Sequence, residues 1–271
     1  ALGGVAHKPW RMPDVENQLV GKPATESTFR EAARQLLAGA SPQLRNMATM
    51  GGNLMQRTRC YYFYDTSTPC NKRNPDANAG PNGCGALGGF NRLHAILGAS
   101  DSCIATNPSD MNVALSALDA VVQIQGINGN RSVPLIDFHR LPGNTPQRDN
   151  VLEPNELIVA IDLPTSRLAG KSHYQKVRDR ASYAFALVSV AARMSVENGT
   201  IQNVRIALGG VAHKPWRMPD VENQLVGKPA TDSTFREAAR QLLAGARPHQ
   251  YNAFKIKLAE NTIVRTLQTV V

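Results

Sequence analysis

The alternation of apolar and polar residues predicts several short β-strands, most of them in the second half of the chain. A strand with one buried face places an apolar side chain at every second position. Asn128 with Gly129, and Asn198 with Gly199, stand where two-residue hairpin turns are expected, so two hairpins are predicted. The predicted strands cover residues 121–125, 158–163, 173–177, 184–196 and 201–208.

Apolar residues at helical spacing, preceded by capping residues, predict helices between and after these strands. Ser109 is a predicted N-cap for a helix that reaches Leu118. Thr234 and Glu237 have the spacing of a capping box at the start of another helix, and residues 259–271 predict a terminal helix. Because hairpins and helices are mixed, without a regular βαβ alternation, the sequence predicts an α+β fold.

Residues 1–40 recur almost unchanged at residues 207–246, and the only difference is that Asp232 replaces Glu26. Solenoid repeats are adjacent and diverge in sequence, so this pair is not of that kind. We interpret it as a recent duplication, an engineered fusion or an assembly error. Two identical apolar helix faces cannot fill the same place in one core, so at least one copy must pack elsewhere.

The composition is that of a folded protein with a basic surface. Of the 271 residues 42% are hydrophobic, and the net charge is +9. The basic residues are scattered and form no nucleic-acid motif, so the charge favours cofactor phosphates or an acidic partner over nucleic acid. No apolar run predicts a membrane span, no secretory signal is visible, and a start at Ala1 indicates a fragment or a processed product.

All four cysteines lie in one long polar segment, residues 57–104, and a loop of that length needs something to fix it. Cys60, Cys70, Cys84 and Cys103 are separated by 9, 13 and 18 residues, without the CxxC pairs of zinc fingers or thioredoxin-like sites. Two disulfides, a zinc ion and a 4Fe-4S cluster are equally compatible with this spacing. The six histidines show no ligand spacing and are interpreted as structural.

A glycine-rich segment before the cysteines is suited to binding an anion. Residues 48–53 read A-T-M-G-G-N. Glycines allow tight bends in which successive backbone N–H groups can face a phosphate. Taken alone this is a weak signal, because most such turns only reverse the chain.

The segment resembles the A-T/S-x-G-G-N segment that contacts the flavin dinucleotide in the FAD subunits of molybdenum hydroxylases, the family of xanthine dehydrogenase and carbon monoxide dehydrogenase. The family's P-x-S-D-L/M-N segment is similar to residues 107–112, N-P-S-D-M-N, which lack the residue between Pro and Ser. Residues 174–180, Y-Q-K-V-R-D-R, resemble a stretch whose lysine lies near the isoalloxazine ring. The resemblance implies that the FAD contacts are Ala48, Thr49, Gly51, Gly52, Asn53, Ser109, Asp110 and Lys176.

In shorter family members the first two of these segments lie much closer together, and here residues 57–104 separate them. This insert resembles that of the FAD subunits of periplasmic aldehyde oxidoreductases and of 4-hydroxybenzoyl-CoA reductase, which hold a 4Fe-4S cluster there. The string R-T-R-C-Y-Y-F-Y-D-T-S-T-P-C-N-K-R carries most of the likeness. The resemblance implies that the cluster ligands are Cys60, Cys70, Cys84 and Cys103.

The implied fold combines a partial PCMH-type FAD-binding domain, residues 41–148, with a carbon monoxide dehydrogenase flavoprotein-type C-terminal domain, residues 149–271. Family members begin with a further small domain whose A-G-G-T-x-L loop wraps the FAD pyrophosphate. Residues 1–40, the copy of residues 207–246, stand in its place. We therefore expect the isolated chain to bind FAD weakly or not at all.

The implied function is electron transfer within a larger enzyme. An aldehyde or xanthine-like substrate is oxidised at a molybdenum cofactor on a large subunit, and electrons pass through the 2Fe-2S centres of a small subunit to this FAD and on to an external acceptor. The resemblance implies a periplasmic complex, with the cytoplasm as the alternative. Two other interpretations are a truncated or chimeric product without FAD and a disulfide-stapled binding protein.

Overall fold

The computed structural model of the chain describes residues 49–75, 81–164, 170–180 and 184–271. The chain divides into two compact units, one formed by Ala1–Thr49 with Arg178–Phe185 and the other by Met50–Val177 with Ala186–Val271. The elements and contacts described below all belong to the second unit. The first copy of the repeat, residues 1–40, lies outside the described residues.

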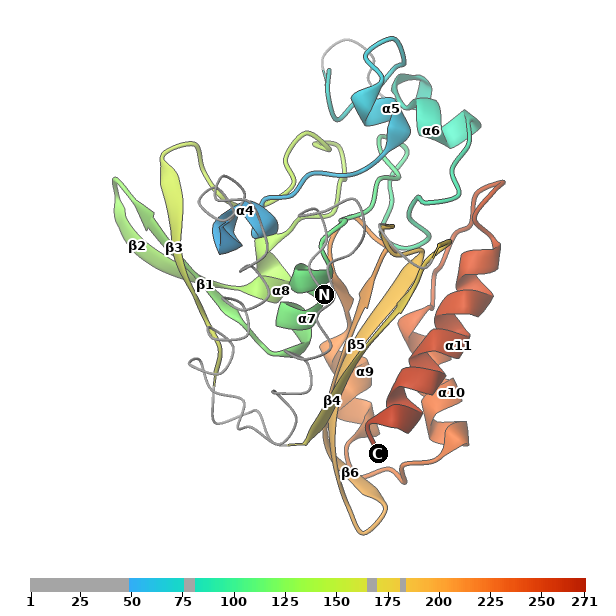
Figure 1. Cartoon of the computed structure of the whole chain (residues 1–271). Helices are drawn as coiled ribbons and strands as arrows, with labels where there is room; N and C mark the ends of the chain where they lie inside the picture. Colours follow the sequence, from blue (N-terminus) through green and yellow to red (C-terminus); the bar gives the residue numbers. More distant parts are fainter. Residues whose placement is uncertain (1–48, 76–80, 165–169, 181–183) are drawn as a thin grey trace. The chain divides into compact units, whose positions relative to one another are not determined.

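A three-stranded antiparallel sheet with the order β2-β1-β3 forms the first half of this unit (Figure 1). Its strands are β1 (Val121–Gly126), β2 (Gly129–Pro134) and β3 (Glu156–Asp162). Gly129 closes the β1–β2 hairpin with a φ of 110°, in the region that favours glycine. The strand β3 follows residue 148 in sequence but completes this sheet by pairing with β1.

Short helices pack beside this sheet and supply part of its core. They are α4 (Met50–Leu54), α7 (Asp110–Ala117) and α8 (Leu135–Phe138). Apolar side chains from one face of the sheet meet those of the helices, as expected for a half-buried strand pattern. The buried set consists of Leu54, Leu115, Ala120, Val122, Ile124, Leu135 and Phe138.

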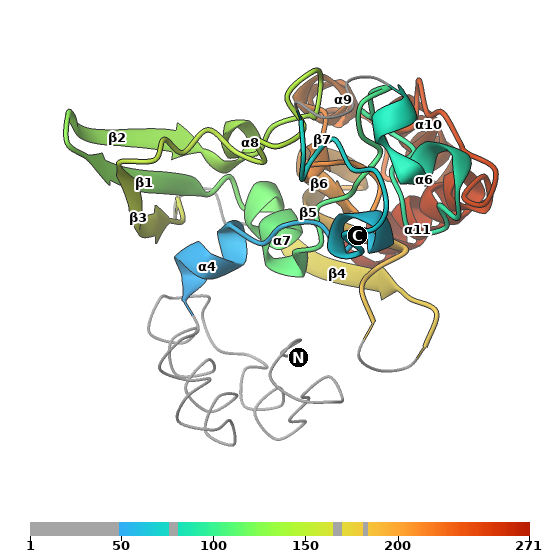
Figure 2. The same ribbon diagram turned by 90° about the horizontal axis from the view of Figure 1, so that it is seen from above.

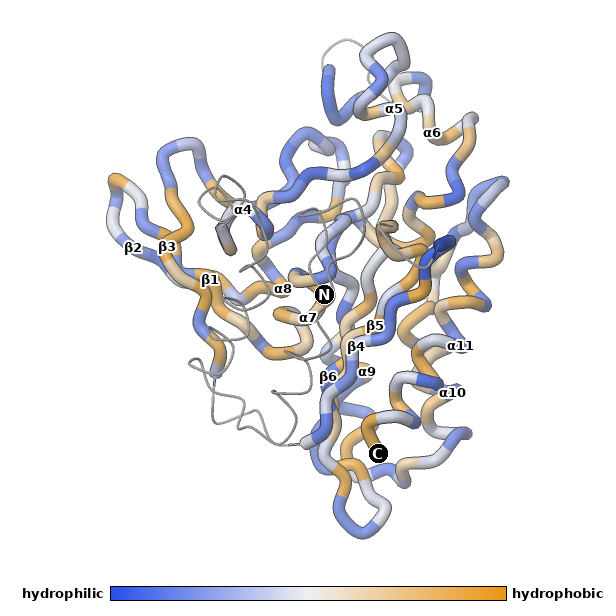
Figure 3. Tube along the Cα trace, in the orientation of Figure 1, coloured by the Kyte–Doolittle hydropathy of each residue, from blue (hydrophilic) through white to orange (hydrophobic). Residues whose placement is uncertain are grey.

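A four-stranded antiparallel sheet with the order β4-β5-β6-β7 forms the second half. Its strands are β4 (Lys171–Val177), β5 (Val188–Glu197), β6 (Thr200–Gly209) and β7 (Trp216–Arg217). Three helices belong to this half, namely α9 (Pro219–Leu225), α10 (Asp232–Leu242) and α11 (Phe254–Thr269). Hydrophobic and hydrophilic residues are mixed along α10 and α11, as expected of helices with one buried side (Figure 3).

The helix α7 lies between the two sheets and joins their cores (Figure 2). Its Leu115 belongs to the core of the first sheet, whereas Val113 and Ala117 pack on Ala191 and Ala207 of the second. Gly209 allows this approach, because a Cβ there would come within 2.6 Å of the Val113 side chain. The position of α7 is therefore fixed from two sides.

Most predicted elements are found, with shifts at their ends. The helix α7 begins after Ser109, and both hairpin turns are where they were predicted. The prediction that Thr234 caps a helix is wrong, because α10 begins at Asp232 and Thr231 is its N-cap. The terminal helix begins at Phe254, and β5 begins at Val188.

Within residues 57–75 and 81–104, the described part of the cysteine-rich insert, the helices are short turns, α5 (Tyr61–Tyr64), η1 (Pro81–Gly83) and α6 (Gly85–Gly88). Its last part runs along the second half of the unit, where the backbone N–H groups of Ile96 and Leu97 donate to the Val211 carbonyl at 2.9 and 3.0 Å. The insert is thus tied to the sheet domain by backbone hydrogen bonds. Among the described residues, no helix has the length and apolar character needed to cross a membrane.

Candidate functional site

The first turn of α7 brings together two of the segments predicted to contact FAD. Ser109 is the N-cap of α7, and its hydroxyl accepts a hydrogen bond from the Asn112 backbone N–H at 3.1 Å. The same hydroxyl donates to Asn53 Oδ1 at 2.6 Å. The glycine-rich segment and the N-P-S-D-M-N segment, separated by the whole insert in sequence, therefore touch in space.

Gly51, Gly52 and Asn53 lie in α4, a helical turn of five residues, and so do not form the open turn that was expected. A Cβ on Gly51 would lie 3.6 Å from Ile158 Cβ, an ordinary contact, so this glycine sits directly against β3. Ala48 lies outside the described residues, and Thr49 belongs to the other compact unit. The described part of the predicted segment is therefore Gly51, Gly52 and Asn53.

Asp110, the first residue of α7, meets the third predicted segment. Its carboxylate accepts from Lys176 Nζ and from the Tyr174 hydroxyl, both at 2.7 Å. The Lys176 side chain is 20% exposed and that of Asp110 is 42% exposed, so the pair remains open to a ligand on one side. Burial and the adjacent Asp110 charge raise the pKa of Tyr174, which keeps its hydroxyl protonated as a donor.

Tyr174 is a site residue that the sequence analysis missed. It stands two positions before Lys176 on β4, and alternate residues of a strand point to the same face. This spacing could have placed Tyr174 beside Lys176. The partner of both residues could not be inferred, because Asp110 is brought there by the packing of α7 on the second sheet.

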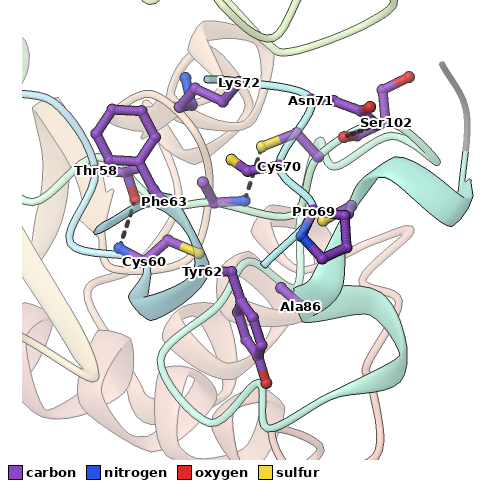
Figure 4. A pocket seen from close by; sticks show the side chains of 13 residues that line it. Thr58, Cys60, Tyr62, Phe63, Pro69, Cys70, Asn71, Lys72, Ala86 and Ser102 are labelled. Atoms are coloured by element: carbon purple, nitrogen blue, oxygen red, sulfur yellow. Dashed lines mark hydrogen bonds between the residues drawn. The ribbon is translucent and has the colours of Figure 1, made fainter. Parts of the chain in front are cut away.

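The four cysteines line one pocket, although they come from four separate parts of the insert (Figure 4). The pocket encloses about 280 Å³ of space free of atoms, part of it open to solvent. Cys70 and Cys84 face each other in an antiparallel β-bridge, and all four cysteines are free thiols. The two disulfides of the binding-protein interpretation are therefore not formed.

Burial raises the pKa of the Cys60 thiol to about 11 and that of the Cys103 thiol to about 12, and it also raises the pKa of the Cys84 thiol. Opposing contributions come from the backbone N–H groups of Phe63 and Tyr62 at Cys60 and from the Lys72 charge at Cys103. Two of the four thiols are buried and two are partly buried, so a set of four thiolates here would need a cation to compensate it. The pocket thus gathers the sulfur donors that a metal centre would need.

The described residues do not form a ready-made site for one metal ion. Within the described residues, no three His, Cys, Asp or Glu side chains lie close enough together to hold a single metal ion. A zinc ion draws four thiolates to about 2.3 Å from one point. In a 4Fe-4S cluster each thiolate binds a different iron, so the four sulfurs stand farther apart. Four cysteines on one pocket supply the sulfur donors that either group would need.

Two basic residues near the cysteines, Lys72 and Arg57, attach the insert to the segment between α8 and β3. Lys72 is buried, donates to the Pro146 carbonyl at 2.6 Å and forms an ion pair with Asp149. Arg57 pairs with the other Asp149 oxygen at 2.7 Å. Asp149 accepts from both basic residues, and nothing in the sequence indicated this role. The Lys72 charge also acts on the Cys103 thiol and lowers its pKa against the larger effect of burial.

One histidine also lies at the sulfur pocket. His94 Nε2 is 3.1 Å from Cys60 Sγ, and the imidazole is buried. Burial and the nearby Lys255 charge lower the pKa of His94 to about 4, so the ring is neutral at physiological pH. The sequence analysis treated His94 as structural, and its spacing from the cysteines gave no signal of this contact.

The chain belongs to the family of FAD-binding subunits of molybdenum-dependent hydroxylases. Residues 15–166 match the family described as the FAD binding domain in molybdopterin dehydrogenase, and residues 172–270 match the CO dehydrogenase flavoprotein C-terminal domain. These matches confirm the resemblance on which the site residues were chosen.

Among its relatives is the aldehyde oxidoreductase FAD-binding subunit PaoB of Escherichia coli, with 53% identity over 87% of this chain and 69% of the relative. The glyceraldehyde dehydrogenase medium chain of Sulfolobus acidocaldarius is 34% identical over 52% of this chain and 47% of the relative. The chain thus spans about half to two thirds of these relatives.

Solved structures confirm the fold. A Cu,Mo-CO dehydrogenase in its cyanide-inactivated form superposes with a TM-score of 0.59 at 20% identity, over 94% of this chain and 72% of that one. Quinoline 2-oxidoreductase from Pseudomonas putida 86 gives a TM-score of 0.56 at 22% identity, over 94% and 71%. The α+β class predicted from the sequence is therefore correct.

Proposed function

We propose that this chain is the FAD- and iron–sulfur-carrying electron-transfer subunit of a molybdenum-dependent aldehyde oxidoreductase. The observation that carries the proposal is the convergence of Asn53, Ser109, Asp110 and Lys176 on the first turn of α7, in a chain of this family. Three separate sequence segments supply these groups. They offer a hydroxyl, an amide, a carboxylate and an ammonium group, which suit the hydroxyls and the ring of a flavin dinucleotide.

Bound FAD would supply the redox chemistry, and the protein would supply binding and electrostatics. Lys176 would hold a positive charge beside the bound flavin, which would stabilise the extra negative charge of its reduced form. Asp110 keeps this ammonium in place and offers its exposed carboxylate oxygens to ligand hydroxyls. The hydrogen bond between Asn53 and Ser109 holds α4 against α7, so the glycine-rich segment would keep its position beside bound FAD.

The second cofactor in this proposal is a 4Fe-4S cluster held by Cys60, Cys70, Cys84 and Cys103. Support comes from the shared pocket and from the partial or complete burial of the four thiols. Lys72 would offset part of the negative charge of the cluster and its thiolates, because its ammonium is buried beside Cys103. A cluster near the flavin would serve as a further electron carrier.

The proposed partners are a large subunit with the molybdenum cofactor and a small subunit with 2Fe-2S centres. Support comes from the FAD-binding family match and from the 53% identity to an FAD-binding subunit of an aldehyde oxidoreductase. The basic charge of the chain suits docking on acidic protein surfaces. We place the complex in the periplasm by the same resemblance.

Titration of the chain with FAD, followed by flavin fluorescence, tests the flavin site. We expect saturable binding, weak in the isolated chain and tighter with its partner subunits, that Lys176→Met and Asp110→Asn each weaken by roughly 10- to 150-fold, since a charged hydrogen bond contributes ~1.5–3 kcal/mol. Lys171→Met is the matched control, because it removes a lysine from the same strand at the far end, where it contacts the Val271 carbonyl. An absence of saturable binding, in the chain alone and with its partner subunits, would refute the proposal.

Iron and acid-labile sulfide analysis after anaerobic purification tests the cluster separately. We expect about four irons and four sulfides per chain, as the 4Fe-4S composition requires. Replacing Cys60 or Cys103 with Ser should lower both numbers together. Zinc in place of iron, or neither metal, would exclude the cluster and leave the FAD proposal intact.

A further inference from the structure

Tyr174 is a residue of the candidate flavin site that has no role in the proposed function. Its hydroxyl donates to Asp110 Oδ1 at 2.7 Å, and Lys176 Nζ donates to Asp110 Oδ2 at the same distance. Tyr174 and Lys176 are alternate residues of β4, so they project from one face of the sheet. Each oxygen of the carboxylate therefore has one donor from this strand.

The ring of Tyr174 is fixed by packing, so its hydroxyl has a defined position. The side chain lies partly buried against a small apolar cluster that joins α7 to β5 and β6 and consists of Val113, Ala117, Ala191 and Ala207. The ring is thus part of the core between α7 and the second sheet. A hydroxyl on a packed ring can hold a partner without ordering a further side chain.

The direction of the hydrogen bond follows from the chemistry of the two groups. A carboxylate can only accept, so Tyr174 supplies the proton of its bond to Asp110. Burial and the adjacent Asp110 charge raise the pKa of Tyr174, which keeps this proton on the phenol. Ser189 opposes this rise, as expected of a hydroxyl that donates to the phenol oxygen, and so does not compete for the Tyr174 proton.

The position of Asp110 gives its carboxylate a second possible direction. Asp110 is the first residue of α7, and the first N–H groups of a helix have no intrahelical acceptor and attract a negative charge. The two donors on β4 turn the carboxylate toward the strand, where the side chain is 42% exposed. Without the Tyr174 hydroxyl, the ion pair with Lys176 alone would hold it there.

We propose that Tyr174 is a positioning residue that holds the Asp110 carboxylate in the orientation that binds FAD, without itself touching FAD. The inference rests on the proposed flavin site and assigns a further residue to it. The single proton of the phenol is used by Asp110, so it is not offered to the ligand. A side chain that is ordered before the ligand arrives need not be ordered on binding, which raises affinity by roughly two- to tenfold.

A role of Tyr174 in packing alone makes a different prediction. Phenylalanine keeps the ring and its apolar contacts and removes only the hydroxyl. If packing were the whole role, Tyr174→Phe would bind FAD as the native chain does. If the hydroxyl acts through Asp110, Tyr174→Phe weakens binding, and this effect depends on the presence of the carboxylate.

The test is a double-mutant cycle in which flavin fluorescence gives the Kd for FAD of the chain with its partner subunits. We expect Tyr174→Phe to raise the Kd by roughly two- to tenfold. It should have no further effect in a chain that carries Asp110→Ala, because residues that act through one contact are not additive. Tyr64→Phe is the matched control, since its exposed hydroxyl bonds to Arg59 on the insert and should leave the Kd unchanged.

A measurement on the native chain covers a variant that does not fold or binds too weakly to titrate. With ¹³C at the hydroxyl-bearing ring carbon of tyrosine, the Tyr174 resonance should shift when FAD binds, because the acceptor of its proton then also binds the ligand. The resonance is assigned by elimination, through Tyr→Phe variants at the other tyrosines.

Three results would overturn the role of Tyr174. They are a native Kd for Tyr174→Phe, an equal further loss in the Asp110→Ala background, and an unchanged Tyr174 resonance in a chain with bound FAD. A native complex that does not bind FAD would instead refute the proposed flavin site, and the inference with it.

Discussion

The hydroxyl of Ser109 has two partners that belong to different parts of the site. It caps α7 by accepting from the Asn112 backbone, and it donates to Asn53 on α4. Ser109 is 3% exposed, so water cannot replace either partner when the hydroxyl is removed. One atom thus connects the geometry of the helix N-terminus to the position of the glycine-rich segment.

Ser109→Ala should lower the free energy of unfolding by ~1–2 kcal/mol, because it removes a helix cap and leaves the Asn53 amide oxygen without its donor. Thr231→Ala is the matched control. Thr231 is also an N-cap, but its side chain accepts no backbone N–H of the first turn of α10 and lies 3.1 Å from the exposed hydroxyls of Ser233 and Thr234, so little change is expected. Urea denaturation of both variants measures the difference, and equal losses would contradict the assignment.

At the scale of elements, buried ion pairs join the end of α7 to the second sheet and to α9. Arg217 on β7 pairs with Asp119 at 2.6 Å and with Glu222 at 2.7 Å, and Arg205 on β6 pairs with Asp119 at 2.9 Å. The Arg217 and Glu222 side chains are almost fully buried. The network fixes the C-terminal end of α7, as Ser109 fixes its beginning.

Arg217→Met should destabilise the protein by ~3–5 kcal/mol, because it leaves two carboxylates buried with reduced compensation. Arg240→Met removes one partner of an exposed pair with Glu237 and should change the stability by less than about 0.5 kcal/mol. Thermal or urea unfolding at neutral pH measures both. A similar small effect for the two variants would show that the network does not stabilise the fold.

The same network predicts a pH dependence. Burial raises the pKa of Asp119, but Arg217 and Arg205 lower it further, so the net shift is below the ordinary value of 3.8. A carboxyl with a lowered pKa stabilises the folded state above its unfolded pKa, and this stability is lost as the pH falls through the folded pKa. The difference between the native chain and Arg217→Met should therefore shrink below pH 3.8. Urea midpoints between pH 7 and pH 3 test this.

The elements show which parts of this structure a sequence can predict. The hairpin between β5 and β6 was predictable because Asn198 and Gly199 adopt φ of 48° and 74°, which these residue types tolerate. The start of α10 was not, because the Thr234–Glu237 spacing fits a capping box while the chain turns helical earlier, at Asp232. The local sequence is compatible with a helix start after Thr231 or after Thr234, and the packing of the helix favours the earlier start.

The site shows the same division between local and long-range information. The sequence placed Asn53, Ser109 and Lys176 in one site through family motifs, and the structure brings their segments together. It could not give the ion pair of Lys176 with Asp110, or the contact of His94 with Cys60, since these depend on how α7 and α11 dock. Such contacts join residues more than thirty positions apart and leave no local pattern.

At the scale of the whole unit, the insert is attached to both halves. Lys72 and Arg57 share Asp149 on the segment between α8 and β3, and Ile96 and Leu97 bond to the Val211 carbonyl in the C-terminal half. The Lys72 ammonium is the most buried member of the first attachment. Docking of the insert therefore depends on a compensated buried charge.

Asp149→Asn should loosen this attachment by ~3–5 kcal/mol, because the buried Lys72 ammonium loses its counter-charge. Limited proteolysis should then cut within residues 57–75 more rapidly than in the native chain. Glu153→Gln is the control, since Glu153 forms an exposed ion pair with Arg148 nearby. Equal cleavage rates in the two variants would argue against the role of Asp149.

Removal of iron is expected to affect the insert and leave the sheets intact. The core of the second sheet consists of side chains such as Val190, Ile206 and Ile263, which are fully buried without any cysteine among them. In its described residues the insert has only short helical turns, together with four buried or partly buried thiols that repel one another once deprotonated. A cluster that binds only the folded insert stabilises it by mass action, and its loss removes that stabilisation from the insert alone.

Hydrogen exchange followed by mass spectrometry, before and after anaerobic chelation of iron, measures this effect by segment. Protection should fall by at least tenfold in residues 57–75 and 81–104, and should be unchanged in β5, β6 and α11, because the free energy of local opening differs between these parts. The peptide that carries β1 and β2 serves as an internal control, since it lies in a third part of the unit. A uniform fall in protection would show that the cluster supports the whole unit, and no fall anywhere would show that the insert is stable without it.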